Sequence, residues 1–302
     1  MNTKKILILG AGYVGKELAR RAHEAGYDIA GTSRNYETLQ SLRRMGATAI
    51  EWSADEAPDP FDSHLGPSTT VIYSIPTLFR SYEDGSEDNA LARHIRPVAR
   101  VAEACRRGGV DRLIYLSSTS VYGDHNGEWV DETTTCRPES PFGRMRHDIE
   151  DHLLQLDVEF PVNIARLVGI YGPHRTLVDY IESGRYRLVD GGKKVTNRIH
   201  VVDIARALIA IVERAGREKR IFNLTDGHPQ TVRDLVEYVC DLQGLKRPPQ
   251  ETLSEYAERK GDPNAVARWK KQIRVVNDRL RQELDFEFNY PDVFAGYQAI
   301  LQ

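Results

Sequence analysis

Three glycines near the N-terminus stand at a spacing that suits phosphate binding. They lie in the segment Gly10-Ala11-Gly12-Tyr13-Val14-Gly15, which has the pattern G-x-G-x-x-G. The first glycine permits a tight turn, the second lets a pyrophosphate approach the backbone, and the third lets a helix pack closely on a strand. The apolar residues 6–9 before the loop predict a buried strand, and a helix is expected to begin near Tyr13. Strand, loop and helix in this order predict a dinucleotide-binding site.

The segment after the second strand predicts which dinucleotide is bound. Sites for NAD usually place an acidic residue there to hold the ribose 2′-hydroxyl. In this chain the position falls at Thr32, and Ser33 and Arg34 follow it without a carboxylate. An arginine there would pair with a 2′-phosphate through a charge-assisted hydrogen bond, so the sequence predicts NADP(H) over NAD(H). The alternative is a solvated loop arginine.

Apolar runs and helical patterns alternate along the first half of the chain. Strands are expected at residues 28–32, 47–52, 69–74, 111–118 and 162–167, and helices at 37–44, 89–107 and 141–156. Such alternation predicts an α/β fold with a doubly wound parallel sheet of the Rossmann type. Ligands bind at the carboxyl ends of such strands, where Asp55, Ser74 and Pro76 fall.

The alternation loosens beyond residue 167. A strand is expected at 195–202, a helix at 204–214, a strand at 220–224 and a helix at 231–243, whereas residues 246–265 are polar. We therefore expect residues 1–167 to form an NADP-binding domain. Residues 168–302 are expected to form mainly a smaller C-terminal substrate lobe, with some segments returning to the Rossmann core.

Composition and charge exclude several classes of protein. The 302 residues carry a formal net charge of −3, which argues against a broad nucleic-acid surface. No apolar run approaches the length of a membrane span, and the N-terminal segment lacks the cleavage site of a signal peptide. Three widely spaced cysteines suggest neither a disulfide framework nor a metal site. These features predict a cytoplasmic protein. We further expect a small-molecule substrate and a monomeric or homodimeric state.

A second motif lies at the end of the strand expected at 111–118. It reads Leu116-Ser117-Ser118-Thr119-Ser120-Val121-Tyr122-Gly123-Asp124, and further runs follow at residues 166–173, 198–203 and 289–291. Together with the glycine loop, these motifs resemble the extended short-chain dehydrogenase/reductase superfamily, which includes the nucleotide-sugar epimerases and dehydratases. The resemblance covers nearly the whole chain and is greatest to the atypical branch of that superfamily. It implies a nicotinamide cofactor and oxidoreductase or epimerase activity.

The resemblance also implies a catalytic group in which a hydroxyl, a tyrosine and a lysine act together. Ser118 matches the hydroxyl that polarises the substrate carbonyl. The segment that matches Y-G-R-x-K is Phe142-Gly143-Arg144-Met145-Arg146, so the tyrosine and the lysine of that pair are both replaced. Arg146 keeps a positive charge that can hold the ribose or a phosphate, whereas Phe142 has no proton to give.

Three residues are alternatives for the missing proton donor. Tyr122 lies four residues after Ser118, His147 follows Arg146, and His200 lies in the 198–203 run. Each also has a structural explanation, as a packed tyrosine, an exposed helix histidine and a packed histidine. Two functional hypotheses therefore stand. The chain is an NADP(H)-dependent oxidoreductase or epimerase with a non-standard proton donor, or it is a dinucleotide-binding sensor or partner protein with little turnover.

Arginines in the C-terminal part are candidates for substrate binding. Nucleotide-sugar relatives often carry an arginine four residues before the histidine of the 198–203 run, and here that position is Thr196. Arg198 shares a strand face with His200 and is the candidate from a shifted place, with a surface ion pair as the alternative. Arg175 is a second candidate anion contact, and its alternative is a solvated side chain.

The residues expected to contact each ligand form three groups. Cofactor contacts are expected from Gly10, Gly12, Tyr13, Val14, Gly15, Thr32, Ser33, Arg34, Asp55, Ser74, Pro76, Ser117 and Arg146. Substrate contacts are expected from Ser118, Thr119, Arg175 and Arg198, and catalytic roles from Ser118, Arg146 and Tyr122.

Overall fold

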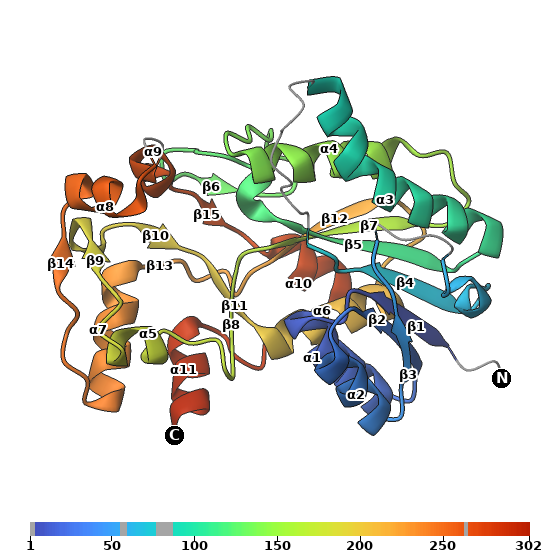
Figure 1. Ribbon diagram of the computed structural model, residues 1–302, viewed down its shortest axis with the longest axis horizontal. Helices are drawn as coiled ribbons and strands as arrows, with labels where there is room; N and C mark the ends of the chain where they lie inside the picture. The colour runs from blue at the N-terminus through green and yellow to red at the C-terminus, as the bar shows by residue number, and fades with distance from the viewer. Residues whose placement is uncertain (1–3, 55–58, 77–86, 263–264) are drawn as a thin grey trace.

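A parallel sheet of seven strands organises the chain, which the computed structural model describes for residues 4–54, 59–76, 87–262 and 265–302 (Figure 1). Its strands are β1 (Lys5–Leu9), β2 (Asp28–Ser33), β3 (Thr48–Glu51), β4 (Thr69–Tyr73), β5 (Arg112–Ser118), β7 (Val162–Leu167) and β12 (Arg220–Leu224). They lie in the order β12-β7-β5-β4-β1-β2-β3, and every pairing between them is parallel. The predicted doubly wound α/β sheet is thereby confirmed.

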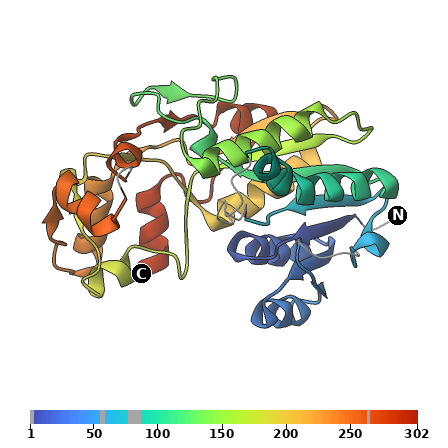
Figure 2. The ribbon, with the colours of Figure 1, turned by 45° about the horizontal axis from the view of Figure 1, so that its top comes forward.

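Helices cover both faces of this sheet. One face packs against α1 (Tyr13–Glu24), α2 (Tyr36–Arg44), α6 (Val201–Arg214) and α10 (Asp278–Leu284). The other face packs against α3 (Glu87–Gly108) and α4 (Pro141–Gln155), which lie side by side (Figure 2). Within the described ranges, no helix combines the length and the apolar character that crossing a bilayer requires.

The central strand β1 shows why this sequence forms a buried sheet. Ile6 and Ile8 pack with α1 and α6, whereas Leu7 and Leu9 pack with α3 on the opposite face. All four side chains are fully buried, and burial of each contributes about 1.5–3 kcal/mol. Because side chains alternate across a strand, a strand that is covered on both faces needs a continuous apolar run.

Two elements from beyond residue 167 complete the sheet and its helical layer. β12 pairs with β7 along five residues, from Arg220 opposite Asn163 to Leu224 opposite Leu167. α6 packs along α1 on one face of the sheet. The sheet therefore contains strands from both sides of the boundary at residue 167.

The strand expected at 195–202 is interrupted at Asn197, and its last two residues belong to a helix. The structure has two short strands, β10 (Val195–Thr196) and β11 (Arg198–His200), and α6 begins directly after His200. The Nδ1 atom of buried His200 accepts a 3.2 Å hydrogen bond from the backbone N–H of Val202 and so caps the helix. Histidine is not among the preferred cap residues, so the apolar pattern alone extends the strand too far.

The remaining elements form a smaller lobe beside the carboxyl ends of the strands (Figure 1). They are the helices α5 (Val178–Glu182), α7 (Val232–Gln243), α8 (Leu253–Lys260), α9 (Ala265–Lys270) and α11 (Val293–Leu301), and the short strands β8 (Gly169–Tyr171), β9 (Leu188–Val189), β13 (Gln230–Thr231) and β14 (Gln250–Glu251). β6 (Trp129–Val130) and β15 (Arg274–Val275) pair with each other. The core of the lobe includes Tyr171 and Tyr297, whose stacked rings have centroids 5.4 Å apart.

The polar stretch 246–265 contains, in its described part, the helix α8 and the first residue of α9. None of the α8 side chains is fully buried, and the helix has clear capping interactions at both ends. Thr252 and Glu255 form a reciprocal capping box at its start, and Gly261 ends it with a φ of 59°. The sequence carries both end signals, and Leu253, Tyr256 and Ala257 between them share the half-buried face of the helix.

Close packing in the lobe core predicts the effect of one added methyl group. A Cβ at Gly296 of α11 would overlap the hydroxyl and ring of buried Tyr171. Glycine to alanine in a helix normally stabilises, but overpacking costs about 1–3 kcal/mol. We expect Gly296→Ala to lower the free energy of unfolding by that amount in denaturant titrations.

The matched control is Gly216→Ala, because a Cβ at Gly216 would meet nothing within 4 Å. It should leave the free energy of unfolding within about 0.5 kcal/mol of the natural protein. An unchanged or increased stability of Gly296→Ala would show that the lobe core is looser than described.

Candidate cofactor and active site

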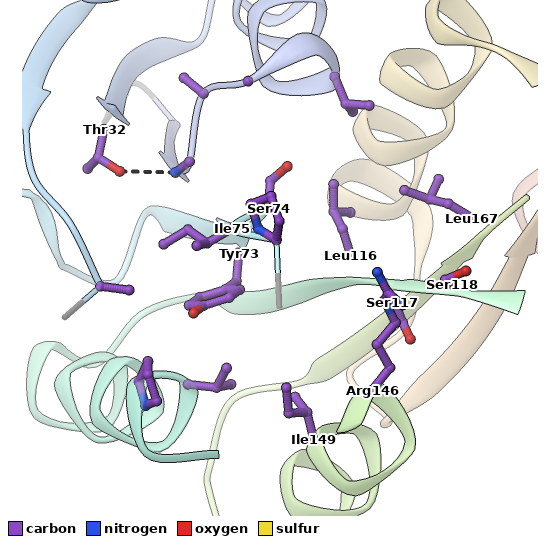
Figure 3. Close-up of a pocket in the computed structure, with 18 of the residues that line it drawn as sticks. Thr32, Tyr73, Ser74, Ile75, Leu116, Ser117, Ser118, Arg146, Ile149 and Leu167 are labelled. Atoms are coloured by element: carbon purple, nitrogen blue, oxygen red, sulfur yellow. Dashed lines mark hydrogen bonds between the residues drawn. The ribbon is translucent and has the colours of Figure 1, made fainter. Parts of the chain in front are cut away.

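A cavity of about 1030 Å³ lies at the carboxyl ends of β1, β2, β3, β4 and β5 (Figure 3). Its walls come from the glycine loop, from the ends of those strands, from α3 and α4, and from residues 167–170 and 175 after β7. These are the elements that a doubly wound sheet brings together at its ligand-binding crevice. The volume matches the upper end of small-molecule and cofactor sites.

The glycine loop has the geometry that a pyrophosphate needs. A Cβ at Gly12 would meet nothing within 4 Å, so the space in front of this residue is open. Gly10 has a φ of +89°, and a Cβ there would lie 2.8 Å from the Ile75 side chain. α1 begins at Tyr13 without a side-chain cap, so its first N–H groups are available to an anion.

Thr32 fixes the loop to the end of β2. Its Oγ1 accepts a 3.0 Å hydrogen bond from the Gly10 N–H, which Figure 3 shows as a dashed line. Its carbonyl oxygen accepts a 2.7 Å hydrogen bond from the Ala11 N–H. Thr32 is 1 % exposed, so its contribution is to hold the loop rather than to meet solvent.

The end of the cavity at β2 and β3 is polar and cationic. Ser33 and exposed Arg34 line it, together with buried Trp52, whose ring packs edge-on to Phe61 at 4.8 Å. Arg100 of α3 lies 5.9 Å from the Trp52 ring centroid. The expected contact Asp55 falls outside the described residues.

Charge in the described cavity lining has one sign. The lining includes Arg34, His94, Arg96, Arg100, Arg146 and Arg175, and it includes no aspartate or glutamate among the described residues. Arg100 is paired with Asp59 at 2.9 Å, and His94 Nε2 lies 3.2 Å from Asp148 Oδ2. The remaining cations give this cavity the chemistry of a site for a phosphorylated ligand.

A buried polar chain begins at the cavity wall. Ser117 lines the cavity, and its Oγ donates a 2.5 Å hydrogen bond to Glu150 Oε1. Glu150 is 1 % exposed and accepts from the Nε and Nη2 atoms of Arg166, with the shorter contact 2.7 Å. The Arg166 guanidinium packs 4.7 Å from the Tyr122 ring centroid, and its pairing with Glu150 raises its pKa despite the opposing effect of burial. Because the Ser117 hydroxyl already donates its hydrogen bond to Glu150, its oxygen can only accept a hydrogen bond from a ligand.

Ser118 and Arg146 meet in the same part of the cavity. Ser118 ends β5, and its Oγ accepts a 3.2 Å hydrogen bond from the Ser120 N–H. Figure 3 shows Arg146 reaching from α4 toward Ser117 and Ser118. Its Nη1 donates a 3.3 Å hydrogen bond to the Phe142 carbonyl. Phe142 is 44 % exposed and is not part of the cavity lining.

Three of the expected site residues do not line this cavity. Tyr122 is fully buried, and its hydroxyl donates a 2.7 Å hydrogen bond to Asn223 Oδ1. Burial raises its pKa, and the hydroxyl points to Asn223 and not into the cavity, which fits the structural explanation of Tyr122. Thr119 is 9 % exposed and directs its hydroxyl at the Leu167 carbonyl at 3.5 Å. Arg198 lies behind the lining residue Gly169, with Nη1 3.0 Å from where a Gly169 Cβ would lie.

The two candidate histidines also have structural partners. His147 pairs with Asp151 at 3.0 Å on the surface of α4. Burial lowers the pKa of His200 to about 4, which fits its role as a neutral hydrogen-bond acceptor at the start of α6. Neither histidine lines the described cavity. The remaining expected contacts within the described residues are part of the lining, except for Gly15, which packs against Ile8 behind the loop.

Several lining residues were not predicted from the sequence. They are Trp52, Ser53 and Tyr73 at the ends of β3 and β4, and His94, Arg96 and Arg100 on α3. The strand ends could have been included, because every strand of such a sheet points its carboxyl end at the crevice. The α3 residues give no such signal, since an amphipathic helix pattern does not tell which turn borders a cavity.

Comparisons with known proteins find one matching family and relatives that are similar over nearly the whole chain. A family model described as the NAD dependent epimerase/dehydratase family matches residues 6–225. Protein YeeZ of Escherichia coli strain K12 is 27 % identical over 299 residues, which cover 96 % of this chain and 97 % of YeeZ. A conserved protein of unknown function from Silicibacter pomeroyi DSS has a solved structure with a TM-score of 0.79 and 31 % identity, covering 99 % of this chain and 98 % of its own. MoeE5 in complex with UDP-glucuronic acid and NAD shares the fold, with a TM-score of 0.76, 22 % identity, and coverage of 98 % and 97 %.

Two residues after β12 lies a buried carboxyl group whose protonation state depends on pH. Asp226 is 3 % exposed, its Oδ1 accepts a 2.9 Å hydrogen bond from the His228 N–H, and its Oδ2 has no partner among the described residues. Burial raises the pKa of Asp226 to about 8, and the nearby Asp292 adds to the effect. A carboxyl group of this kind binds its proton more tightly in the folded chain than in the unfolded chain.

Asp226 should therefore make stability fall as the pH rises. Its stabilising contribution is present below the ordinary carboxyl pKa and is lost as the pH rises through about 8. The slope is at most about 1.4 kcal/mol per pH unit. We expect Asp226→Asn, whose amide N–H replaces the carboxyl O–H, to abolish this part of the pH dependence between pH 6 and 8 in urea titrations. The exposed Asp179→Asn is the control, and parallel pH curves for the natural protein and Asp226→Asn would contradict the assignment.

Proposed function

The chain belongs to the NAD-dependent epimerase/dehydratase family, whose cofactor is a nicotinamide dinucleotide, and from this premise we propose that it is an NADP(H)-preferring oxidoreductase or epimerase. Its substrate is a small polar or sugar-like molecule. The observation that supports this proposal is the cavity itself, in which an open glycine loop, a cationic lining and Ser118 face one space. A polar hydroxyl and a cation beside the expected nicotinamide position indicate an enzyme rather than a passive binding protein.

The preference for NADP(H) rests on the end of β2. Arg34 is exposed at the cavity, and no described carboxylate lies within ion-pair distance of it. Ser33 beside it supplies a hydroxyl. A 2′-phosphate would find one cation and one hydroxyl there, whereas no described carboxylate in the lining would accept a free 2′-hydroxyl. A hydrogen bond to a charged group is worth about 1.5–3 kcal/mol, which is a tenfold or greater effect on affinity.

The residues at the other end of the cavity would orient the reacting groups. When bound, the nicotinamide ring supplies the hydride acceptor or donor. Ser118 would polarise a substrate carbonyl with its hydroxyl. Arg146 would hold the nicotinamide ribose or a substrate anion, and it cannot serve as a base because guanidinium stays protonated.

A non-standard proton donor is part of the proposal. Within the described lining, His94 is the side chain most suited to acid-base chemistry, since imidazole is the commonest general acid or base. Asp148 of α4 lies 3.2 Å from its Nε2 and fixes the orientation of the ring. The pair would combine a proton-carrying group and an orienting carboxylate in the way that catalytic histidines use.

Cofactor preference is tested by titration calorimetry with NADPH, NADP⁺, NADH and NAD⁺. We expect Arg34→Gln to weaken NADPH binding about tenfold or more and to leave NADH binding within about twofold, because only NADPH carries the 2′-phosphate. Arg43→Gln is a matched control, since Arg43 is an exposed arginine of α2 outside the cavity lining. If the natural protein prefers NADH, Arg34 does not bind a 2′-phosphate, and the family assignment is unaffected.

Turnover is tested by following nicotinamide absorbance with a panel of nucleotide sugars and small keto or hydroxy compounds. We expect Ser118→Ala and His94→Gln to lower the rate by about 10²–10⁴-fold, the usual contribution of general acid-base groups. Turnover that appears only after Phe142→Tyr with Arg146→Lys would instead identify a dinucleotide-binding sensor or partner protein. An unchanged rate in His94→Gln would exclude His94 as the proton donor.

A further inference from the structure

A tight turn from the C-terminal part lies against the start of α1. Residues 172–175, which we call the 172–175 turn, are closed by backbone hydrogen bonds between Gly172 and Arg175, the shorter of them 2.9 Å. His174 within the turn has a φ of 60°. A Cβ at Gly172 would lie 2.6 Å from the Tyr13 hydroxyl oxygen, so the turn approaches α1 as closely as a glycine permits.

Tyr13 of the glycine loop joins the turn to the cofactor site. Its hydroxyl donates a 2.8 Å hydrogen bond to the Pro173 carbonyl. The Arg175 guanidinium lies 5.5 Å from the centroid of the Tyr13 ring, which is a cation–π distance. Burial raises the pKa of Tyr13 to about 12, so this hydroxyl keeps the proton that the bond to Pro173 requires. Both contacts hold Arg175 in a fixed place beside the first turn of α1.

The charge of Arg175 has no acidic partner in the part of the chain that the structure describes. No described carboxylate lies within 4 Å of its guanidinium, and the side chain lines the same cavity as Gly10 and Gly12. Since α1 also presents its positive end and uncapped N–H groups there, two sources of positive potential converge on one space. An anion in front of Gly12 is the ligand that suits both.

We propose that Arg175 binds the pyrophosphate of the dinucleotide and that the 172–175 turn retains the bound cofactor. The inference rests on the proposed function, because it needs a dinucleotide at the glycine loop. Arg34 lies directly after β2, Arg146 lies on α4 near Ser118, and Arg175 lies beside Tyr13 at the start of α1, so the three lining arginines come from different walls of the cavity. The cofactor leaves this space only when Arg175 releases it, and the Tyr13 hydrogen bond to Pro173 resists movement of the turn.

The test is the rate at which bound NADPH or NADH is displaced from the full-length protein by excess oxidised cofactor, measured by stopped-flow nicotinamide fluorescence. We expect Arg175→Gln to accelerate dissociation about tenfold or more for both cofactors, because both carry the pyrophosphate. Arg175→Lys should retain part of the effect, since it keeps the charge but not the planar fork. Tyr13→Phe keeps the ring and loses the bond to Pro173, so it should accelerate dissociation a few-fold.

Two control variants separate this contact from others. Arg185→Gln removes an exposed arginine that lies 5.4 Å from the Tyr180 ring, a similar cation–π pair outside the cavity lining, and it should change neither rate. Arg34→Gln should accelerate dissociation of NADPH alone. Thermal melting of each variant confirms that the fold is intact.

The outcomes distinguish the two proposals. Dissociation from Arg175→Gln within twofold of the natural rate for both cofactors overturns the pyrophosphate contact and leaves the proposed function standing. An effect confined to NADPH overturns it as well, because Arg175 would then bind the 2′-phosphate. Failure of the natural protein to bind any of these dinucleotides overturns the proposed function and this inference together.

Discussion

The buried ion pair between Glu150 and Arg166 joins the elements on one side of the cavity. It joins α4 to β7 beneath the cavity, and through the Ser117 hydroxyl it also joins both to the end of β5. Removing one partner of such a pair typically costs about 3–5 kcal/mol, because the other charge is left buried and unpaired. The pair therefore sets where α4 lies, and with it the position of Arg146 opposite Ser118.

The same arrangement keeps negative charge out of the described cavity lining. The carboxylate nearest the lining residue Ser117 is paired instead of facing the cavity: Glu150 accepts hydrogen bonds from Arg166 and from the Ser117 hydroxyl. The described cavity lining is left with cations and hydroxyls. A phosphorylated cofactor thus meets a surface from which competing negative charge has been removed, and the helix start of α1 adds to the attraction.

The sequence was most informative where one local rule decides the structure. The strands expected at 6–9, 162–167 and 220–224 are present with the expected bounds or within a residue, and the first of them is a continuous apolar run. The cap at His200 depends on a side-chain hydrogen bond at a helix start from a residue type that is not among the preferred caps. The place of Tyr122 could not be read from its motif, because the same spacing from Ser118 suits either a cavity or a core position, and its partner Asn223 lies 101 residues further along the chain. His94 could not be predicted as a site residue for a related reason, because its partner Asp148 lies on another helix.

The pairing of β12 with β7 has a consequence for folding during synthesis on the ribosome. A nascent chain that has emerged only to residue 167 holds six of the seven strands, and β7 is then the edge of an incomplete sheet. Four of its six residues are buried and apolar (Val162, Ile164, Ala165 and Leu167), and the unpaired N–H and C=O groups of an edge strand can pair with any other extended chain. That edge is closed only when residues 220–224 arrive, so the N-terminal part depends on a stretch synthesised more than fifty residues later. The interval between these two points is the period in which such a chain is most exposed to aggregation and most in need of chaperone protection.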